Sequence, residues 1–314
     1  SFQSFQKIWK QKGDHEVIAE RYFSRFQNLL QTSKSKITFA SLDLMVKRLD
    51  REEVEKQFEN TSLLIIDETH GINASEYNRV LLRYKELNLN YRIMGLTATP
   101  FRNDDDDNNS IRGIFESLYQ ITNDEGNDVP SPMKYLMKEE YLSNVKFELI
   151  HADESHLESS QYFRELHGSV IDTCSVILNK KQNTIIFAES KSHAIALSIS
   201  LTRKGIKNGL IIGNTPDPVR KELLSDFGNK ERELSILVNH QILATGIDVP
   251  GMNSIIILSD VKSSSMALQI LGRALRGVKN GGNKENVIYL TKHNYTNFTE
   301  WDLLEDMMLN QGYE

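Results

Sequence analysis

The chain has 314 residues and a mass of 36.0 kDa, which corresponds to about two domains. Its 39% hydrophobic and 25% charged residues are ordinary for a globular protein, and its single cysteine, Cys174, excludes an internal disulfide or a cysteine-based zinc module and favours the reducing cytoplasm. No apolar run is long enough to span a bilayer, and the net charge of −6 argues against a protein that coats nucleic acid through bulk positive charge, although not against a local nucleic-acid groove.

Short apolar runs recur along the chain and predict buried strands. They are rich in isoleucine, leucine and valine, which is typical of parallel strands that are covered on both faces. The runs occupy residues 36–41, 62–67, 91–96, 184–188, 209–212, 234–238, 254–258 and 287–290.

Amphipathic stretches lie between and around these runs and predict helices. Alternation of strands and helices is typical of α/β layers that are joined by right-handed crossovers. The sequence therefore predicts an α/β fold with parallel sheets. The expected helices occupy residues 17–30, 75–87, 133–142, 160–180, 192–204, 219–227, 265–275 and 301–309.

A change in composition near the middle of the chain predicts a domain boundary. Residues 103–110 read as a solvated acidic loop, and residues 123–132 are rich in turn-forming residues. A new series of strands follows. We therefore expect a first lobe over residues 1–130, a linker over 131–143 and a second lobe over 144–314.

Two adjacent carboxylates, Asp67 and Glu68, follow the apolar run at 62–67. Ligands of open α/β sheets bind beyond the carboxyl ends of the strands. There Asp67 could hold Mg²⁺, and Glu68 could orient and deprotonate an attacking water, which is the chemistry that phosphoryl transfer needs. The alternative is a strand that ends in a solvated acidic turn.

Hydroxyl groups follow the next strand. Thr97 and Thr99 flank a small residue at the sheet edge, and Pro100 ends the strand. If the two strands are neighbours, these hydroxyls can hydrogen-bond His70 and respond to its position. The alternative is an ordinary threonine–proline turn.

Two further segments in the second half suit a bound phosphate. Gln269, Arg273 and Arg276 are spaced by four and three residues on a helical pattern, so we expect them to share one face, where guanidinium groups match phosphate oxygens. The small-residue loop at 243–250 follows a buried strand and allows backbone N–H groups to approach a phosphate. The alternatives are a solvated basic helix face and a glycine–proline loop.

The ordered set of these motifs resembles the superfamily 2 helicases and translocases, and it is most similar to the branch that contains the motor subunits of type III restriction enzymes. The resemblance covers roughly residues 36–291. The sequence at 36–45 resembles the segment that precedes motif II in that branch. The segments that resemble motifs II to VI are DETH at 67–70, TATP at 97–100, TIIFAES at 184–190, ATGIDVP at 244–250 and QILGRALR at 269–276.

The resemblance implies two RecA-like lobes with ATP and Mg²⁺ between them, and it implies a role for each matching residue. Asp67 would hold Mg²⁺, and Glu68 would activate water. Arg273 and Arg276 would be arginine fingers, with Gln269 where the family has His or Gln. The remaining implied roles are coupling of the nucleotide state to nucleic acid by His70, Thr97 and Thr99, nucleotide contact by Gly246 and Asp248, and contact with the nucleic-acid backbone by Ser41, Ser190 and Thr245.

One element of the family pattern has no match. The chain contains no G-x-x-x-x-G-K-[ST] sequence, the loop that cradles phosphates in these motors. We expect that the first lobe is truncated at its N-terminus and that a longer protein or another chain supplies this loop. The alternative is a helicase-like clamp, or one half of a split motor, that binds nucleic acid or a partner protein. The resemblance favours DNA over RNA, and a nuclease or other subunit is a possible partner.

Overall fold

The computed structural model divides the chain into two compact units, residues 1–118 and 119–314. Each unit is described by itself. The predicted lobe limits at 130 and 144 stay a prediction. The residues that the structure describes are 18–22, 36–67, 69, 75–96, 115, 117, 122–123, 125–127, 129, 132–152, 159–229, 231, 233–240, 249, 251–262 and 264–300.

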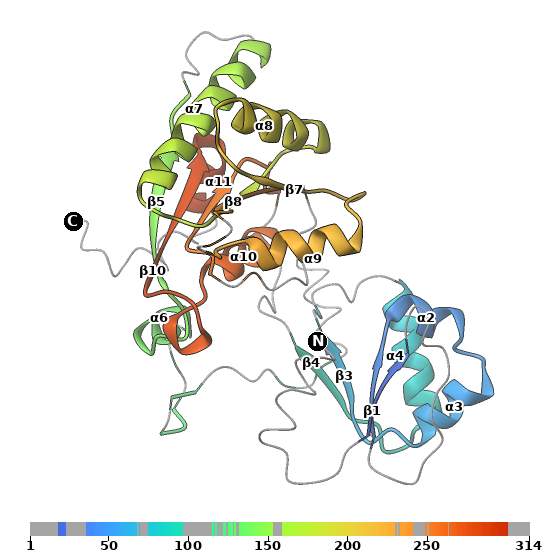
Figure 1. Ribbon diagram of the computed structural model, residues 1–314. Coiled ribbons are helices and arrows are strands. Elements are labelled where there is room, and N and C mark those ends of the chain that lie inside the picture. The colour runs from blue at the N-terminus through green and yellow to red at the C-terminus, as the bar shows by residue number, and fades with distance from the viewer. Residues whose placement is uncertain are drawn as a thin grey trace. The chain divides into compact units, whose positions relative to one another are not determined.

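The first unit contains two pairs of parallel strands and three helices among its described residues (Figure 1). Strand β1 pairs with β2, and β3 pairs with β4. The elements are β1 (Ile18–Tyr22), β2 (Lys36–Ala40), α2 (Leu42–Lys47), α3 (Glu52–Glu59), β3 (Leu64–Asp67), α4 (Ser75–Leu87) and β4 (Ile93–Leu96).

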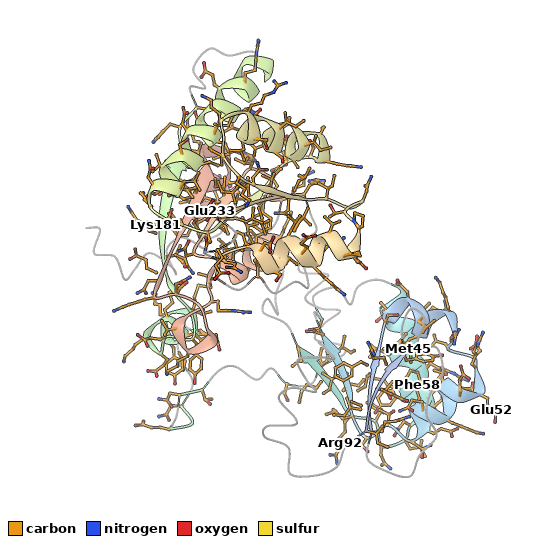
Figure 2. The ribbon with its side chains drawn as sticks, in the orientation of Figure 1. Met45, Glu52, Phe58, Arg92, Lys181 and Glu233 are labelled. Carbon is orange, nitrogen blue, oxygen red and sulfur yellow. The ribbon has the colours of Figure 1, made fainter. Side chains whose placement is uncertain are left out.

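An aromatic cluster holds α3 against α4. Val54 and Phe58 are one helical turn apart on α3 and are both buried, and Phe58 meets Tyr84 of α4 edge to face with ring centroids 5.5 Å apart. The Tyr84 hydroxyl donates to the Thr61 carbonyl at 2.9 Å, so its buried polar end has a partner. Figure 2 marks Phe58 within this unit.

The helix expected at residues 17–30 was wrong over its first part, because residues 18–22 form β1. This strand pairs in parallel with β2, with Ile18 opposite Lys36 and Tyr22 opposite Ala40. Glu20 accepts from Thr38 at 2.5 Å and forms an ion pair with Lys36 at 2.9 Å, and Tyr22 is completely buried. These contacts with β2 outweigh the helical pattern, which is only a local preference.

The second unit is built on one six-stranded sheet in which every strand pair is parallel. The strand order is β5-β10-β9-β6-β8-β7. This sheet confirms the predicted α/β fold class with parallel strands. The strands are β5 (Asn144–Ile150), β6 (Thr184–Phe187), β7 (Gly209–Ile211), β8 (Ile236–Asn239), β9 (Ser254–Ile257) and β10 (Glu285–Thr291).

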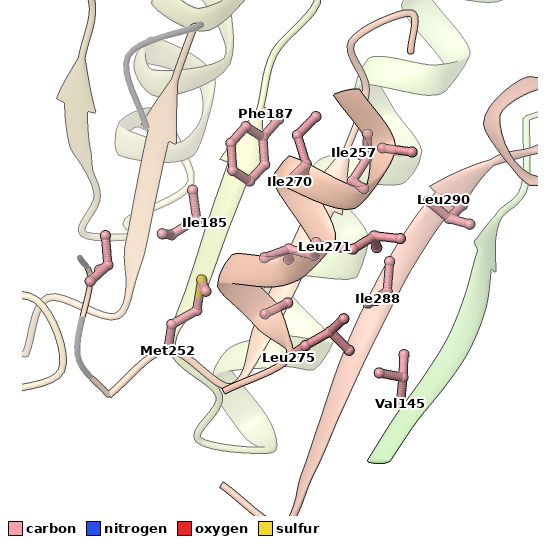
Figure 3. Packing of buried hydrophobic residues seen from close by; sticks show 14 of the residues in the cluster. Val145, Ile185, Phe187, Met252, Ile257, Ile270, Leu271, Leu275, Ile288 and Leu290 are labelled. Atoms are coloured by element: carbon pink, nitrogen blue, oxygen red, sulfur yellow. The ribbon is translucent and has the colours of Figure 1, made fainter. Parts of the chain in front are cut away.

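Helices cover both faces of this sheet, as the continuous apolar strands predict. Alternate residues of one strand pack on opposite faces: Ile185 faces the cluster under α10, and Ile186 faces the cluster under α7 and α8. Figure 3 shows Ile270 and Leu271 of α10 packed on the first face. The helices are α6 (Pro132–Lys138), α7 (Ser159–Asn179), α8 (Lys191–Arg203), α9 (Asp217–Asp226), α10 (Ser264–Ala274) and α11 (Lys292–Glu300), with a short 3-10 helix, η3 (Val278–Asn280).

Most of the predicted elements are confirmed. All eight apolar runs overlap a strand, and five expected helices correspond to α4, α7, α8, α9 and α10 within about two residues. The helix expected at 133–142 is shorter, since α6 ends at Lys138, and the helix expected at 301–309 lies outside the described residues. No helix in the described part of the chain is long and apolar enough to cross a membrane.

Backbone hydrogen bonds connect two segments that are distant in sequence at the amino-terminal edge of the sheet. The Gly277 amide donates to the Tyr141 carbonyl at 3.0 Å, the Lys279 amide donates to the Glu140 carbonyl at 3.1 Å, and the Ser143 amide donates to the Leu275 carbonyl at 2.8 Å. We call residues 139–143 and 275–282 together the joint. It fixes the segment that follows α6 against the segment that follows α10.

The joint predicts a strong effect for Gly277→Ala. A Cβ at position 277 would lie 2.3 Å from the Glu140 carbonyl oxygen and 2.7 Å from two further backbone carbons, and backbone cannot rotate away as a side chain can. We expect a loss on the order of 3 kcal/mol in the free energy of unfolding, measured by urea titration and circular dichroism. In the control Gly168→Ala, on α7, the new methyl meets no atom within 4 Å, so stability should rise by up to about 1 kcal/mol. Equal midpoints for the two variants would contradict this account of the joint.

A pair of histidines lies between α7 and α8. The ring centroids of His167 and His193 are 5.9 Å apart, and His167 Nε2 and the Ser200 hydroxyl are 2.9 Å apart. His193 Nδ1 is buried without a hydrogen-bond partner among the described residues. Burial lowers the pKa of both rings, and the neighbouring His167 lowers the pKa of His193 further.

These lowered pKa values predict that acid destabilises the second unit. The unfolded chain takes up protons on both histidines as the pH falls through about 6.5, whereas the folded chain resists protonation until a lower pH. The stability present above pH 6.5 is therefore lost as the pH falls below it. Thermal midpoints measured between pH 8 and pH 5.5 should fall, and they should fall less in a variant that carries both His167→Gln and His193→Gln. The same decline in wild type and variant would assign the effect to other groups.

Candidate functional site

The carboxyl ends of β3 and β4 lie side by side in the first unit. Asp67 is the last residue of β3, is exposed, and pairs in register with Leu96, the last residue of β4. The condition that the two motif-bearing strands are neighbours is therefore met. Glu68, His70, Thr97 and Thr99 lie outside the described residues.

Thr69 attaches the acidic turn to the end of β4. Its side chain is buried, and its hydroxyl donates to the Leu96 carbonyl at 3.3 Å. A Cβ at Gly95 would lie 2.8 Å from the Thr69 methyl group and 2.7 Å from the ring of Phe115. Sequence reasoning did not select Thr69 or Gly95. The only signal was that a glycine interrupts the apolar run at 91–96, which indicates close approach of another group.

Ser41 follows β2 and begins α2, but its side chain does not cap that helix. Its amide donates to the Tyr22 carbonyl at 3.2 Å, which fixes the residue to the end of β1. The hydroxyl is thus not used in a helix cap, and the residue directly follows the carboxyl end of β2. The contact with the nucleic-acid backbone that the resemblance implies for Ser41 stays a prediction.

Ser190 lies at the carboxyl edge of the six-stranded sheet and caps α8. Its hydroxyl oxygen accepts from the His193 amide at 3.1 Å and lies 3.0 Å from the Ser192 hydroxyl oxygen. Its neighbour Lys191 donates through Nζ to the Asn214 side-chain oxygen at 2.9 Å, which joins the segments that follow β6 and β7. Sequence reasoning did not select Lys191, a cation beside the predicted phosphate contact.

The end of β8 is held by two further contacts at the same edge. Asn239 is buried and donates to the Ile186 carbonyl at 3.0 Å, and His240 Nδ1 lies 3.2 Å from the Ala188 carbonyl oxygen. Thr245, Gly246 and Asp248 lie outside the described residues.

The prediction that three residues share one face of a helix was wrong for Arg276. Helix α10 ends at Ala274, and Arg276 lies beyond it in an antiparallel bridge with Leu142. The helix ends before Arg276 because the chain that follows it pairs with residues 140–143 in the joint. The backbone positions of Gln269 and Arg273 are on α10, one turn apart and away from its buried residues, and their side chains lie outside the description.

The donor chemistry that the structure describes fits a hydrated magnesium ion better than a closed metal centre. Asp67 offers a carboxylate at an exposed sheet edge, and Mg²⁺ is held by one or two carboxylates while it keeps several waters. In the described part of the chain, no group of three or more His, Cys, Asp or Glu side chains could hold a metal. Cys174 is buried, and burial raises the pKa of its thiol to about 12, so it is not a reactive nucleophile.

Two models of known families match the chain in consecutive order. Residues 1–102 match the type III restriction enzyme, res subunit, and residues 168–278 match the helicase conserved C-terminal domain. The first match contains Ser41, Asp67 and the segment that follows β4. The second contains β6, β7, β8 and β9 of the six-stranded sheet, together with α10 and Arg276.

Known helicases resemble the chain over most of its length. IRC3 of Saccharomyces cerevisiae, whose name assigns it provisionally as an ATP-dependent helicase, is 26% identical over 77% of the chain and 35% of its own length. The ATP-dependent DNA helicase RecG of Streptococcus pneumoniae is 25% identical over 84% of the chain and 38% of its own length. The chain thus spans little more than a third of either relative.

The fold also matches a solved helicase structure. Dbp5 of Saccharomyces cerevisiae, bound to RNA and ADP BeF3, superposes with a TM-score of 0.61 at 14% identity, over 98% of the chain and 71% of that structure. The structure therefore has the α/β architecture of RecA-like helicase domains. Together with the two family matches, this supports a resemblance to superfamily 2 helicases with features of the type III restriction enzymes.

Proposed function

We propose that the chain is the motor part of a nucleic-acid-dependent ATPase that acts as a helicase or translocase. The single observation that carries the proposal is the adjacent, in-register ending of β3 and β4, which brings Asp67 to the end of the strand that leads into Thr97 and Thr99. This arrangement lets one sheet edge hold a metal–nucleotide complex and pass its state to neighbouring hydroxyls.

The proposed roles follow the chemistry of each group. Asp67 holds Mg²⁺ directly or through water, Glu68 activates the attacking water, and Arg273 and Arg276 stabilise the charge that develops on the transferred phosphoryl group. ATP is the proposed nucleotide. Gln269, Gly246 and Asp248 are proposed to line its site, and His70, Thr97 and Thr99 to couple it to the bound strand.

The proposed nucleic-acid contacts are to the backbone and do not read sequence. Ser41, Ser190 and Thr245 supply hydroxyls, and Lys191 adds a cation that is already oriented by Asn214. Few basic contacts suffice, so the net charge of −6 is compatible with binding. We propose DNA as the track, in keeping with the resemblance to type III restriction enzymes. A cytoplasmic location is part of the same proposal.

A second candidate function is a clamp that binds nucleic acid or a partner without hydrolysis, or one half of a split motor. The observation in its favour is that residues 1–314 contain no Walker A sequence, the loop that would hold the β- and γ-phosphates beside Asp67.

The deciding experiment compares ATP hydrolysis by two proteins, with and without single- and double-stranded DNA and RNA. One protein is the chain of residues 1–314, and the other is the longest native product of its gene. The motor proposal expects hydrolysis by the longer product, stimulated by DNA and weakened as salt concentration rises. Hydrolysis by neither protein would favour the clamp, and hydrolysis that appears only when another native chain is added would favour the split motor.

A further inference from the structure

An open cavity of about 630 Å³ lies at the amino-terminal edge of the six-stranded sheet, within the second unit. It lies between α6 on one side and η3 with the turn before β10 on the other, and Figure 1 shows these segments side by side. Ser190, Lys191 and His240 lie at the opposite, carboxyl edge of the same sheet. The cavity is therefore separate from the edge that carries the proposed nucleic-acid contacts.

The rim of the cavity is positively charged. Lys134, Lys138 and Lys284 line it, and Glu140 is the single acid among the described lining residues. None of these three lysines forms an ion pair or a side-chain hydrogen bond with another described residue. By contrast, the nearby Lys279 is used, in an ion pair with Glu139 at 3.3 Å and over the ring of Tyr141 at 4.6 Å. Three ammonium groups against one carboxylate among the described lining residues favour an anionic ligand.

Part of the cavity lining is apolar. Val129, Met137, Leu142 and Val278 line it, and Tyr135 adds aromatic surface. A volume of 630 Å³ is within the usual range for small-molecule sites, and it is far larger than inorganic phosphate requires. The lining therefore suits a ligand that combines a phosphate with a flat, partly apolar ring.

The walls of the cavity are held in place before any ligand arrives. Both walls belong to the joint or adjoin it: the Asn280 side chain donates to the Tyr141 carbonyl at 2.9 Å, and the Asn283 side chain donates to the Met252 carbonyl at 2.8 Å. A site that is already formed loses less entropy on binding. Ligand binding here would also stiffen the segment that carries Arg276.

We propose that this cavity binds a phosphomonoester that carries a planar ring, of about the size of a nucleoside monophosphate. Lys134, Lys138 and Lys284 bind the phosphate, and the apolar part of the lining, with Tyr135, receives the ring. The inference goes beyond the proposed function and does not rest on it, because none of the described residues assigned to hydrolysis or to nucleic-acid contact lines the cavity.

Pyridoxal 5′-phosphate tests the site directly, because it has a phosphate, a planar ring and an aldehyde. The aldehyde condenses with a lysine amine to an imine and releases water, and borohydride then reduces the imine to a stable secondary amine. In the full chain at limiting reagent, peptide mass spectrometry should find about tenfold more label on Lys134, Lys138 and Lys284 than on Lys221, an exposed lysine of α9. Excess AMP should protect the three cavity lysines, and adenosine, which lacks the phosphate, should not.

Charge reversal provides the second measurement. A variant with Lys138→Glu and Lys284→Glu should reduce labelling of Lys134 about tenfold or more, because it replaces two of the three cations that bind the phosphate with anions that repel it. The matched control carries Lys204→Glu and Lys221→Glu, which reverse two exposed charges outside the cavity, and it should label as wild type. Equal labelling of the cavity lysines and Lys221, no protection by AMP, or equal protection by adenosine would each overturn the proposal.

Discussion

Replacement of Glu68 by glutamine is expected to abolish ATP hydrolysis while ATP and nucleic-acid binding stay nearly unchanged. Glutamine has the same shape but cannot accept the proton of the attacking water, so the loss falls on the chemical step. Asp67, which is the proposed metal ligand, stays in place at the end of β3. Turnover would be measured in the DNA-stimulated ATPase assay, and binding by fluorescence anisotropy with labelled DNA and labelled ATP.

The control for this variant is Glu59→Gln at the exposed end of α3, which removes the same charge from the same unit. It should hydrolyse ATP at the wild-type rate. If the Glu68 variant still turned over at a tenth of the wild-type rate, another group would have to activate the water.

Replacement of Arg276 by alanine is expected to reduce turnover by about 10³-fold or more, as loss of an arginine finger does in other phosphoryl-transfer enzymes. The guanidinium acts on charge that appears only in the transition state, so the effect should fall on kcat more than on KM. Lysine at the same position keeps the charge but loses the planar fork, so Arg276→Lys should recover only part of the rate.

Arg276 also lies in the bridge to Leu142, so a loss of folding has to be separated from a loss of catalysis. The thermal midpoint of the alanine variant should stay within a few degrees of wild type, since the bridge is made by backbone groups. Arg203→Ala in the last turn of α8 is the control, because it removes an exposed arginine from the same unit. An effect of only a few fold on kcat for Arg276→Ala would exclude it as a finger.

The six-stranded sheet could be predicted from the sequence because its signals are local and strong. Strands such as β6 and β9 are short runs of isoleucine that are buried on both faces, and no helix of four residues competes with them. Strand β1 could not be predicted in the same way. Its sequence, IAERY, becomes a strand only because Glu20 and Tyr22 find partners on β2 and α3, which lie far along the chain.

The candidate site was predictable in its order of motifs but not in its local geometry. The neighbouring positions of Asp67 and Leu96 follow from a general rule for parallel sheets. The position of Arg276 beyond the end of α10 does not follow from such a rule. It depends on a pairing with residues 140–143, which are more than 130 residues earlier in the chain. Thr69 and Lys191 were missed for a similar reason, since their partners, the Leu96 carbonyl and Asn214, are not adjacent to them in sequence.

The position of β5 at the edge of the sheet has a consequence for biosynthesis. Its hydrogen-bonding partner is β10, and the first paired residues, Asn144 and Glu285, are 141 positions apart. At roughly 5–20 residues per second, a ribosome needs about 7–28 seconds to make the intervening chain. During that time both edges of β5 are unpaired, and the segment after α6 lacks the residues that complete the joint. The second unit is therefore expected to fold late and slowly, and its nascent form is the stage at which chaperone binding would matter most.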